Sequence, residues 1–431
     1  MIGPVKIFTK VSQRRSGSSR LWFASSRLPA LGFTPGQCFT TDRVGAHGLS
    51  LRPARHSKNQ VSFQRRVGGP RPVIDIAAPM LASIISPDEE VRLTLRHNQV
   101  LIEPSVRTFN IRRGREPRAF YKYVEVFAGG GTLSKAMEAT GRFRCQSAIE
   151  LNPDFADVFS VLHPQAEVIV GDARTIHPGE VEPFDVLVAG IPCTSFAPIG
   201  IAHHKIEGRE EDGPTGDLFI PVLGMVNFHM PRLVLVENVP GFAESAPGRL
   251  FKAHLQRLGY HIYETILKGH EDWNEPTTRD RYLLVATLTP GFAVTNPHQP
   301  FTGTLAAYLD PLDEARDKAD IAAIAKSVAY YQRNAVAQKA KGNNFHFQTL
   351  SHASTWCPTL TRSMCFIKPP FVETPWGFRR IRREEAERLQ GITIPTESDK
   401  LAREIIGQGV LPRVFQKVAG QVAVFLDQSA V

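Results

Sequence analysis

Short apolar runs alternate with helix-length amphipathic segments through the middle of the chain. The apolar runs end at Gly, Asn or Pro and cover Tyr123–Phe127, Cys145–Leu151, Glu167–Val170, Phe184–Ala189, Arg232–Val236, His261–Leu267 and Tyr282–Thr287. The amphipathic segments include Leu133–Thr140, Asp154–Leu162, Leu218–Phe228 and Arg249–Leu258. Seven apolar, β-branched strands that alternate with helices predict an α/β fold with a mostly parallel sheet covered on both faces.

Glycines and carboxylates follow the first three predicted strands, at the edge of a parallel sheet where ligands bind. Gly129–Gly131 come directly after the first strand, and glycine lets the backbone turn tightly and approach a ligand. Glu150 ends the second strand, where a carboxylate can accept both hydroxyl groups of a ribose, and Asp172 ends the third, beside an expected adenine. The pattern predicts a nucleoside cofactor. It leaves NAD and S-adenosylmethionine open, although Ser134 stands where the dinucleotide fingerprint has its third glycine.

A cysteine and a glutamate follow the next two strands. Cys193 comes after the fourth strand, directly behind Pro192, and Glu237 comes after the fifth strand. Neighbouring strands place both residues at the same edge of the sheet, and a thiol beside a carboxyl group is suited to covalent catalysis. Each residue alone has a structural interpretation, as a buried thiol or a helix-capping acid. Their occurrence at successive strand ends favours catalysis.

Six short motifs along residues 121–428 resemble those of the cytosine-5 DNA methyltransferases, in the family's order. They are Phe127–Gly131 and Gly407–Val410 for the cofactor, Pro192-Cys193 for the nucleophile, Glu237-Asn238-Val239, Arg279-Asp280-Arg281, and Arg383–Gly391 in support of the recognition domain. One match is weak evidence, whereas six in order are specific. The resemblance implies a Rossmann-like, S-adenosylmethionine-dependent methyltransferase sheet with helices on both faces and a small target-recognition insertion.

The resemblance also gives each catalytic residue a role. The Cys193 thiolate adds to carbon 6 of cytosine, which makes carbon 5 nucleophilic. Glu237 holds ring nitrogen 3 and the exocyclic amine, and so stabilises the charge that develops on the ring. Arg281 contacts the base carbonyl and Arg279 supports the same pocket. The target base leaves the duplex for this chemistry, at a cost of roughly a few kcal/mol.

S-adenosylmethionine is the cofactor that the resemblance implies, with no metal. The residues that it assigns to the cofactor site are Phe127, Ala128, Gly129, Gly130, Gly131, Thr132, Glu150, Leu151, Asp172, Pro192, Leu218, Gln408 and Gly409.

Four departures from the family's pattern lie around the expected reaction centre. Thr194 replaces a Gln, Ala197 replaces a Ser, Thr277 replaces the Gln before the paired arginines, and Gln408-Gly409 replace Asn-Ala or Asn-Ser. These changes affect packing, phosphate contacts and cofactor binding, and leave the nucleophile and the acid in place. We therefore expect a DNA (cytosine-5-)-methyltransferase. RNA cytosine-5 methylation and a DNA-binding regulator with a degenerate methyltransferase body are the alternatives.

Charge is distributed unevenly over the 431 residues. The chain has 51 Lys and Arg and 42 Asp and Glu, a net charge of +9. Residues 1–120 hold 20 of the basic and 7 of the acidic residues, which leaves 31 and 35 for the remainder. A basic first third attached to a slightly acidic remainder indicates an N-terminal module that faces a polyanion.

A weak internal repeat indicates that this basic part is folded and is not a transit peptide. Leu28–Gln37 leads into an alternating segment that ends at Leu49–Pro53, and Ala78–Val91 leads into one that ends at Leu101–Pro104. Each copy is typical of a short helix or turn followed by a hairpin. The pattern resembles swapped-hairpin modules of the AbrB and SymE type. We expect a small, mostly β N-terminal module, which binds DNA phosphates or simply exposes a solvated basic face.

The domain boundaries follow from these motifs. We expect the basic β module over residues 1–104, a linker over 105–120, the catalytic cofactor-binding domain over 121–287, a short target-recognition region over 288–378, and a return to the catalytic domain over 379–431. Within the recognition region, residues 304–341 are predicted to be helical. Tyr330, Tyr331 and Arg333 then face DNA or pack within a solvated helix.

The remaining features concern compartment and partners. Five cysteines without a Cys-x-x-Cys pair argue against a disulfide framework or a zinc ribbon, and no apolar run approaches the ~18 residues of a membrane span. We expect a cytoplasmic, nucleoid-associated protein of a bacterium or a phage-infected host, of the restriction-modification kind. Its partner is double-stranded DNA with a flipped target cytosine, and no membrane. Self-association through the N-terminal module is left open.

Overall fold

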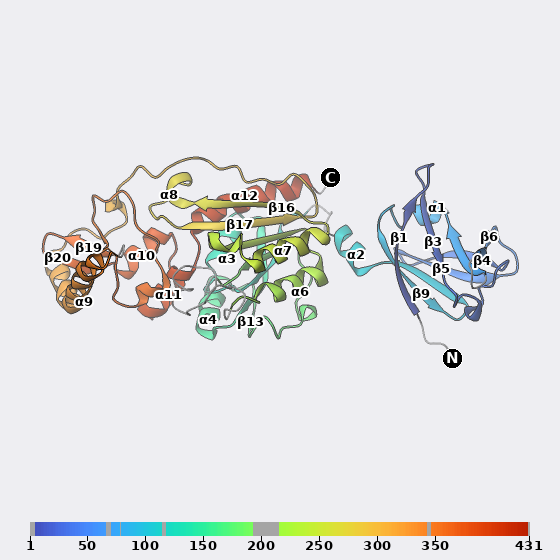
Figure 1. Ribbon diagram of the computed structural model, residues 1–431, viewed down its shortest axis with the longest axis horizontal. Coiled ribbons are helices and arrows are strands. Elements are labelled where there is room, and N and C mark those ends of the chain that lie inside the picture. The colour runs from blue at the N-terminus through green and yellow to red at the C-terminus, as the bar shows by residue number, and fades with distance from the viewer. Residues whose placement is uncertain are drawn as a thin grey trace. The chain divides into compact units, whose positions relative to one another are not determined.

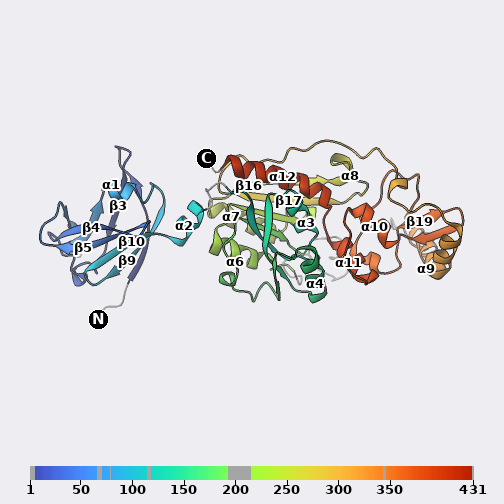
Figure 2. The ribbon, with the colours of Figure 1, turned by 180° about the vertical axis from the view of Figure 1, so that it is seen from behind.

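The computed structural model describes residues 5–65, 70–77, 79–113, 118–192, 215–342 and 346–429. The chain forms two compact units, residues 1–113 and 114–431, and each has its own hydrophobic core (Figures 1 and 2). Helix α2 (Val106–Arg113) belongs to the first unit, so the segment expected to be a linker begins with a helix.

A seven-stranded sheet forms the centre of the second unit, with the order β13-β12-β11-β14-β15-β17-β16 (Figure 1). The strands from β13 to β15 are parallel, and β17 is antiparallel to both of its neighbours. The mostly parallel sheet is thus confirmed, with strand ends shifted by a residue or two from the predicted runs. The strands are β11 Tyr121–Val126, β12 Phe143–Glu150, β13 Glu167–Val170, β14 Val186–Gly190, β15 Leu233–Asn238, β16 His261–Lys268 and β17 Asp280–Thr287.

Helices cover both faces of this sheet. Helices α3 (Thr132–Glu138) and α12 (Pro412–Gln428) share one core with the strands, and α12 crosses in front of the sheet in Figure 2. In α12 the buried Val414, Val418 and Val422 recur every four residues, which is the spacing that places side chains on one helix face. Helices α6 (Phe219–His229) and α7 (Ala246–Arg257) lie in front of the sheet in Figure 1.

A separate apolar cluster joins α4 (Pro153–Leu162) to α10 (Arg383–Gln390) and α11 (Asp399–Gln408). Helix α4 begins at Asn152, whose side chain accepts a hydrogen bond from the backbone N–H of Asp154, and α11 begins at Ser398 in the same way. The shorter helical elements of this unit are α8 (Gly269–Asp272) and the 3₁₀ turns η2 (Pro178–Glu180), η4 (Pro240–Phe242), η5 (Leu305–Ala307) and η6 (Arg362–Cys365).

The region expected to recognise the target contains one long helix and a small sheet. Strands β18 (Thr349–Leu350), β19 (Phe371–Thr374) and β20 (Gly377–Arg380) form the small sheet, and helix α9 (Glu314–Ala340) packs against β19 and β20. Tyr331 packs against Phe371, with ring centres 6.1 Å apart, while Tyr330 is 55% exposed. The predicted helix is therefore present from residue 314 onward, and one of its two tyrosines is packed.

The first unit contains two antiparallel sheets. The larger has the order β1-β9-β10-β5-β4-β6 and the smaller has the order β2-β3-β8-β7. The elements are β1 Val5–Lys10, β2 Ser12–Gln13, β3 Ser19–Ala24, η1 Pro29–Leu31, β4 Cys38–Val44, β5 Gly48–Ala54, β6 Asn59–Gln60, β7 Ser62–Gln64, β8 Arg71–Ile76, α1 Pro79–Ala82, β9 Glu90–Arg96 and β10 Gln99–Pro104. Among the described residues of the whole chain, no helix has the length and apolar character needed to cross a membrane.

Candidate active site

The turn after β11 carries the first group of predicted cofactor residues. Phe127, Gly129 and Gly131 have positive φ angles of 61°, 54° and 81°, a conformation that glycine adopts without strain. A side chain on Gly129 would meet nothing within 4 Å, so its backbone faces open space. A Cβ on Gly130, in contrast, would lie 2.6 Å from Cγ2 of Ile405. The turn thus needs glycine at position 130, where Ile405 packs against it. At Gly129 the turn is open to a ligand.

Glu150, at the end of β12, is hydrogen-bonded to this turn. Its Oε2 accepts from the backbone N–H of Gly129 at 2.7 Å, and its Oε1 accepts from that of Asn152 at 2.8 Å. The next residue, Leu151, is 65% exposed, which leaves an apolar surface beside the carboxylate. Amide, carboxylate and apolar groups are what a nucleoside needs from a site, so these residues fit the adenosyl part of the cofactor.

Asp172 and Leu218 lie farther along the same edge. The carboxylate of Asp172 accepts from the backbone N–H of Arg174 at 2.9 Å, and the Arg174 guanidinium also pairs with Asp217 at 2.6 Å. Leu218, directly after Asp217, is buried at the start of α6. Asp172 is thereby oriented by a neighbour before any ligand binds.

Glu237, the predicted acid, lies beside the end of β14. Strands β14 and β15 pair in parallel, with Gly190 directly opposite Glu237, as the sequence predicted for these neighbouring strands. A Cβ on Gly190 would lie 3.6 Å from Oε2 of Glu237, so glycine leaves room for the carboxylate. Asn238, the next residue, donates from Nδ2 to the carbonyl of Ile191 at 3.2 Å and thus fixes the chain just before Pro192.

Arg281 forms an ion pair with Glu237. Its Nε lies 2.7 Å from Oε1, and the two side chains are only 13% and 12% exposed. Burial raises the pKa of Glu237, while the positive charges of Arg281 and Arg279 oppose the shift. A buried carboxyl group with a raised pKa beside a guanidinium can donate a proton or a hydrogen bond to a base.

Arg279, which the sequence analysis assigned to the support of the pocket, is held by backbone carbonyls. Its guanidinium is 2% exposed and donates to the carbonyls of Leu360, at 2.7 Å, and Gly407, at 3.1 Å. These two carbonyls belong to the segments that return from the recognition region. These contacts join the residue just before β17 to the C-terminal segments.

The last cofactor motif packs against the first. The backbone N–H of Val410 donates to Oγ1 of Thr132 at 3.1 Å, and a Cβ on Gly409 would lie 2.6 Å from that oxygen. Gly409 therefore replaces the Ala or Ser of the family where a side chain has no room. Gln408 is exposed. Thr277 is buried, and its Oγ1 has no hydrogen-bond partner in the described part of the chain.

The nucleophile motif cannot be placed. Cys193, together with the departures Thr194 and Ala197, lies in residues 193–214, outside the described residues. Pro192 is half-buried, two residues beyond Gly190, which faces Glu237. The described site therefore contains Glu237, Arg281, the glycine turn and Glu150, and ends at Pro192.

A buried polar cluster beneath the glycine turn was missed by the sequence analysis. Glu125, in the middle of β11, accepts a hydrogen bond from the hydroxyl of Ser134, and burial raises its pKa to about 8. His163 contacts Oε2 of Glu138 through Nδ1 at 2.6 Å and the carbonyl of Gly131 through Nε2 at 3.1 Å. A carboxylate in an otherwise apolar central strand is the one sequence signal that pointed to this cluster.

A second missed feature is an exposed tryptophan beside the catalytic strand. The backbone N–H of Cys357 donates to the carbonyl of Pro276 at 2.7 Å, and that of Thr278 donates to the carbonyl of Cys357 at 3.0 Å. Trp356, the neighbour of Cys357, is 50% exposed. The region expected to recognise the target thus has an exposed aromatic side chain next to a residue that pairs with the segment before Arg279.

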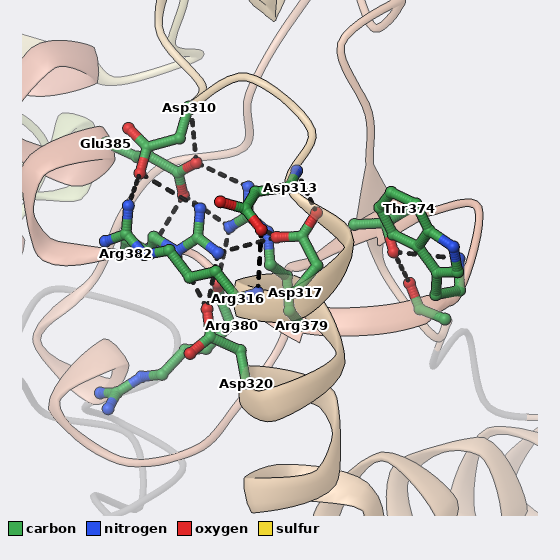
Figure 3. Close-up of polar contacts among 12 residues, drawn as sticks. Asp310, Asp313, Arg316, Asp317, Asp320, Thr374, Arg379, Arg380, Arg382 and Glu385 are labelled. Carbon is green, nitrogen blue, oxygen red and sulfur yellow. Dashed lines mark hydrogen bonds and ion pairs between the residues drawn. The ribbon is translucent and has the colours of Figure 1, made fainter.

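Ion pairs attach the recognition helix to α10 (Figure 3). Arg379 and Glu385 are fully buried and paired at 2.7 Å. Arg382 pairs with Asp317 on α9 at 2.7 Å and with Asp310 at 3.2 Å. Residues 383–391, the segment predicted to support the recognition domain, therefore begin directly after Arg382, whose ion pairs hold the start of α9.

Within the described residues, no group of three or more His, Cys, Asp or Glu side chains is arranged to hold a metal ion.

Comparison with known proteins agrees with this geometry. A family model described as C-5 cytosine-specific DNA methylase matches residues 121–423. A type II methyltransferase from Bacillus sp. (strain RFL6), M.Bsp6I, is 26% identical over 313 residues, which cover 69% of this chain and 96% of that protein. The type II methyltransferase M.NlaX of Neisseria lactamica is 28% identical over 321 residues, which cover 71% of this chain and 97% of that protein.

Solved structures show the same fold at low identity. The Dnmt2 methyltransferase of S. pombe superposes with a TM-score of 0.54 at 16% identity, over 72% of this chain and 98% of that one. The Entamoeba histolytica methyltransferase EhMeth gives 0.55 at 17% identity, over 72% and 99%. The Rossmann-like methyltransferase fold is thereby confirmed.

Proposed function

The chain belongs to the C-5 cytosine-specific DNA methylase family, and on that premise we propose which of its residues carry the reaction. The family transfers a methyl group to carbon 5 of cytosine in DNA, with S-adenosylmethionine as the donor, and this is the function of the chain. The observation that carries the residue assignment is the buried pair of Glu237 and Arg281 at the strand edge that also leads to Cys193.

Cys193 is the proposed nucleophile. Its thiolate adds to carbon 6 of the cytosine, and the electron pair of the ring double bond makes carbon 5 nucleophilic. Carbon 5 takes the methyl group, then loses its proton to a base. The electrons of that bond re-form the ring double bond as the thiolate leaves carbon 6. Each turnover thus regenerates the free cysteine.

Glu237 and Arg281 stabilise the ring during the addition. Glu237, with its raised pKa, donates to ring nitrogen 3 and accepts from the exocyclic amine. Nε of Arg281 pairs with Glu237 and its Nη1 donates to the carbonyl of Asp280, so Nη2 is the group that we assign to the base carbonyl. Arg279 positions the strand that carries Arg281, through the carbonyls of Leu360 and Gly407.

The proposed cofactor site is the glycine turn with its neighbouring carboxylates. Glu150 would hold the ribose, Leu151 and Phe127 would border the adenine with Asp172, and the open backbone at Gly129 would face the methionine part. When bound there, S-adenosylmethionine supplies an electrophilic methyl group. The residues of the chain orient it and exclude water from the reacting centre.

The partners and compartment extend this proposal. DNA is the substrate, and we propose that the target cytosine is flipped out of the duplex, because Glu237 lies in a nearly closed position that a stacked base does not reach. We further propose residues 288–378 as the target-recognition region, 379–431 as the return to the catalytic domain, and a bacterial, nucleoid-associated location. Self-association through residues 1–104 stays a prediction, tested by the oligomeric state of the chain in solution.

A labelled-methyl transfer assay on duplex DNA, single-stranded DNA and tRNA tests the function. Transfer to duplex DNA, with bisulfite sequencing of DNA from expressing cells to give the target, is the expected result. Transfer to tRNA alone would replace DNA by RNA as the substrate. Retention of DNA on a gel without transfer to any of the three would make the chain a DNA-binding regulator.

A further inference from the structure

The strand pairing of the first unit has an internal two-fold symmetry. If β1 to β5 are matched with β6 to β10 in order, the sheet order β1-β9-β10-β5-β4-β6 reads the same from either end, and so does β2-β3-β8-β7. Each half gives its first strand to the hairpin of the other half, since β1 pairs with β9 and β6 pairs with β4. The two halves of one chain therefore exchange their first strands with each other.

The buried core repeats with the same symmetry. Apolar side chains that are at most 4% exposed recur roughly 50 residues apart, as repeated supersecondary units do. The matched pairs are Val11 and Val61, Leu21 and Ile74, Phe23 and Ile76, Leu28 and Leu81, Leu31 and Ile84, Phe39 and Val91, Leu49 and Val100, and Leu51 and Ile102. The two halves are thus equivalent in packing as well as in strand order.

Arginines recur at one equivalent pair of turns. The sequence Val11-Ser12-Gln13-Arg14-Arg15 leads out of β2, and Val61-Ser62-Phe63-Gln64-Arg65-Arg66 leads out of β7. Arg14 and Arg65 are exposed and form no ion pair with any residue that the structure describes. The first turn is closed by a hydrogen bond from the N–H of Gly17 to the carbonyl of Arg14 at 2.8 Å.

Arg14 and Arg65 directly follow β2 and β7, the outer strands of the small sheet. Because these two strands run in opposite directions, the two arginines lie at diagonally opposite corners of that sheet. With strands ~4.8 Å apart and ~3.3 Å per residue, a sheet of this size places the corners about 25 Å apart. Measured along the axis of B-DNA, that separation spans roughly seven base-pair steps at ~3.4 Å each, so one duplex is long enough to contact both arginines.

The net positive charge of the first unit favours a polyanionic partner. Residues 1–113 hold 18 Lys and Arg against 6 Asp and Glu, and three of those acids are already paired, with Arg20, Arg92 and Arg112. The family match begins only at residue 121 and leaves this unit without a role. Among polyanions, duplex DNA is favoured because it is the substrate of the attached enzyme, so the choice of DNA rests on the proposed function.

We propose that the first unit is a second DNA-binding surface, which holds duplex DNA by its phosphates through Arg14 and Arg65, the residues that follow the equivalent strands β2 and β7. The surface tethers the enzyme to its substrate without contributing to the methyl-transfer chemistry. The two turns contribute equally because the unit is symmetric.

Single and double alanine variants in the full-length chain test the proposal. The salt dependence of binding to a duplex without a cytosine target is measured for Arg14→Ala, Arg65→Ala and the double variant. Arg43→Ala with Arg96→Ala is the matched control, because it removes two exposed charges from the hairpins of the larger sheet. A structured RNA of equal length is the competing ligand.

We expect each single variant to lower the slope of log K against log salt by about 0.9, which is about fivefold in affinity at 0.15 M salt, and the double variant by about twice that slope. The control keeps the wild-type slope. Unequal single effects, a loss confined to the control, or tighter binding of RNA would each overturn the proposal. Methyl transfer at saturating DNA should stay at the wild-type rate in all variants. A failure of the second DNA-binding surface can therefore be told apart from a failure of the proposed methyltransferase function.

Discussion

Nε of Arg281 lies 2.7 Å from Oε1 of Glu237, and both side chains are almost closed off from solvent. An arginine on β17 and a glutamate on β15 come together because these two strands are neighbours, although 43 residues of sequence separate them. The pair gives the site an acid of raised pKa and a cation that holds it in place.

Replacement of Glu237 by Gln should slow methyl transfer by roughly 10²–10³, the loss typical of removing one group that stabilises developing charge. The pKa of Glu237 is raised, so the protonated, donating form is favoured at low pH and is lost as pH rises through that pKa. The single-turnover rate of the wild type should therefore have a descending limb on the alkaline side. Glu237→Gln should lack that limb, and a variant that keeps it would show that another group titrates.

Replacement of Cys193 by Ser should abolish methyl transfer, because a serine hydroxyl is a far weaker nucleophile than a thiolate. The wild type should form a covalent adduct with duplex DNA that contains 5-fluorocytosine, visible on a denaturing gel, and Cys193→Ser should form none. Cys145→Ser is the control, because Cys145 is buried in the sheet core. Wild-type turnover by Cys193→Ser would rule out the covalent mechanism.

Replacement of His163 by Gln should weaken the binding of S-adenosylmethionine by about tenfold, the equivalent of about one hydrogen bond. His163 joins Glu138 to the carbonyl of Gly131, and both partners accept hydrogen bonds, so Gln can satisfy only part of this bridge. Isothermal titration with S-adenosylhomocysteine measures the change. His261→Gln on the exposed face of β16 should bind like the wild type; equal affinity in both variants would remove His163 from the site.

Glu125 should make the second unit lose stability as pH rises. Its pKa is raised from 4.5 to about 8, so its contribution is fully present below pH 4.5 and is lost as pH rises through about 8. The loss amounts to at most roughly 5 kcal/mol at 1.36 kcal/mol per pH unit. Urea unfolding at pH 5, 6.5 and 8, followed by the fluorescence of the buried Trp273, measures it. Glu125→Gln, which still accepts from Ser134, should flatten this dependence, and an unchanged pH profile would contradict the assignment.

A chain that starts at residue 118 should keep the methyltransferase fold and bind DNA more weakly, with a smaller salt dependence. Residue 118 is a suitable start because Arg118 pairs with the buried Asp185 at 2.6 Å and so belongs to the second unit. Filter binding over a range of salt concentrations compares it with the full chain. Equal affinity and equal salt slope would show that the basic residues 1–113 take no part in DNA binding.

The arrangement of the catalytic unit was largely predictable because its signals are local. Residues 186–189 and 233–236, in β14 and β15, are apolar throughout, which marks buried parallel strands, and Glu237 follows directly after the second run. Chemistry at strand ends can be predicted from sequence in this way because parallel strands all end at one edge. Cys193 stays a prediction, since it lies outside the described residues.

Arg279 shows where prediction from sequence stops. It stands two residues before Arg281, and the motif indicates only that it supports the same pocket, without its partners. Those partners are carbonyls 81 and 128 residues away along the chain. Only the folded chain identifies them.

The sequence by itself determined the α/β alternation, the glycine turn, the order of the motifs and the concentration of positive charge in the first third, because each depends on residues near one another in the chain. The tertiary structure alone decided that burial raises the pKa of Glu125 and Glu237 and that Arg279 is held by two distant carbonyls. It also decided which strands, β1 and β6, are exchanged between the two halves that the sequence repeat indicated. Burial and strand exchange depend on contacts between distant segments, and no local pattern encodes which segments meet.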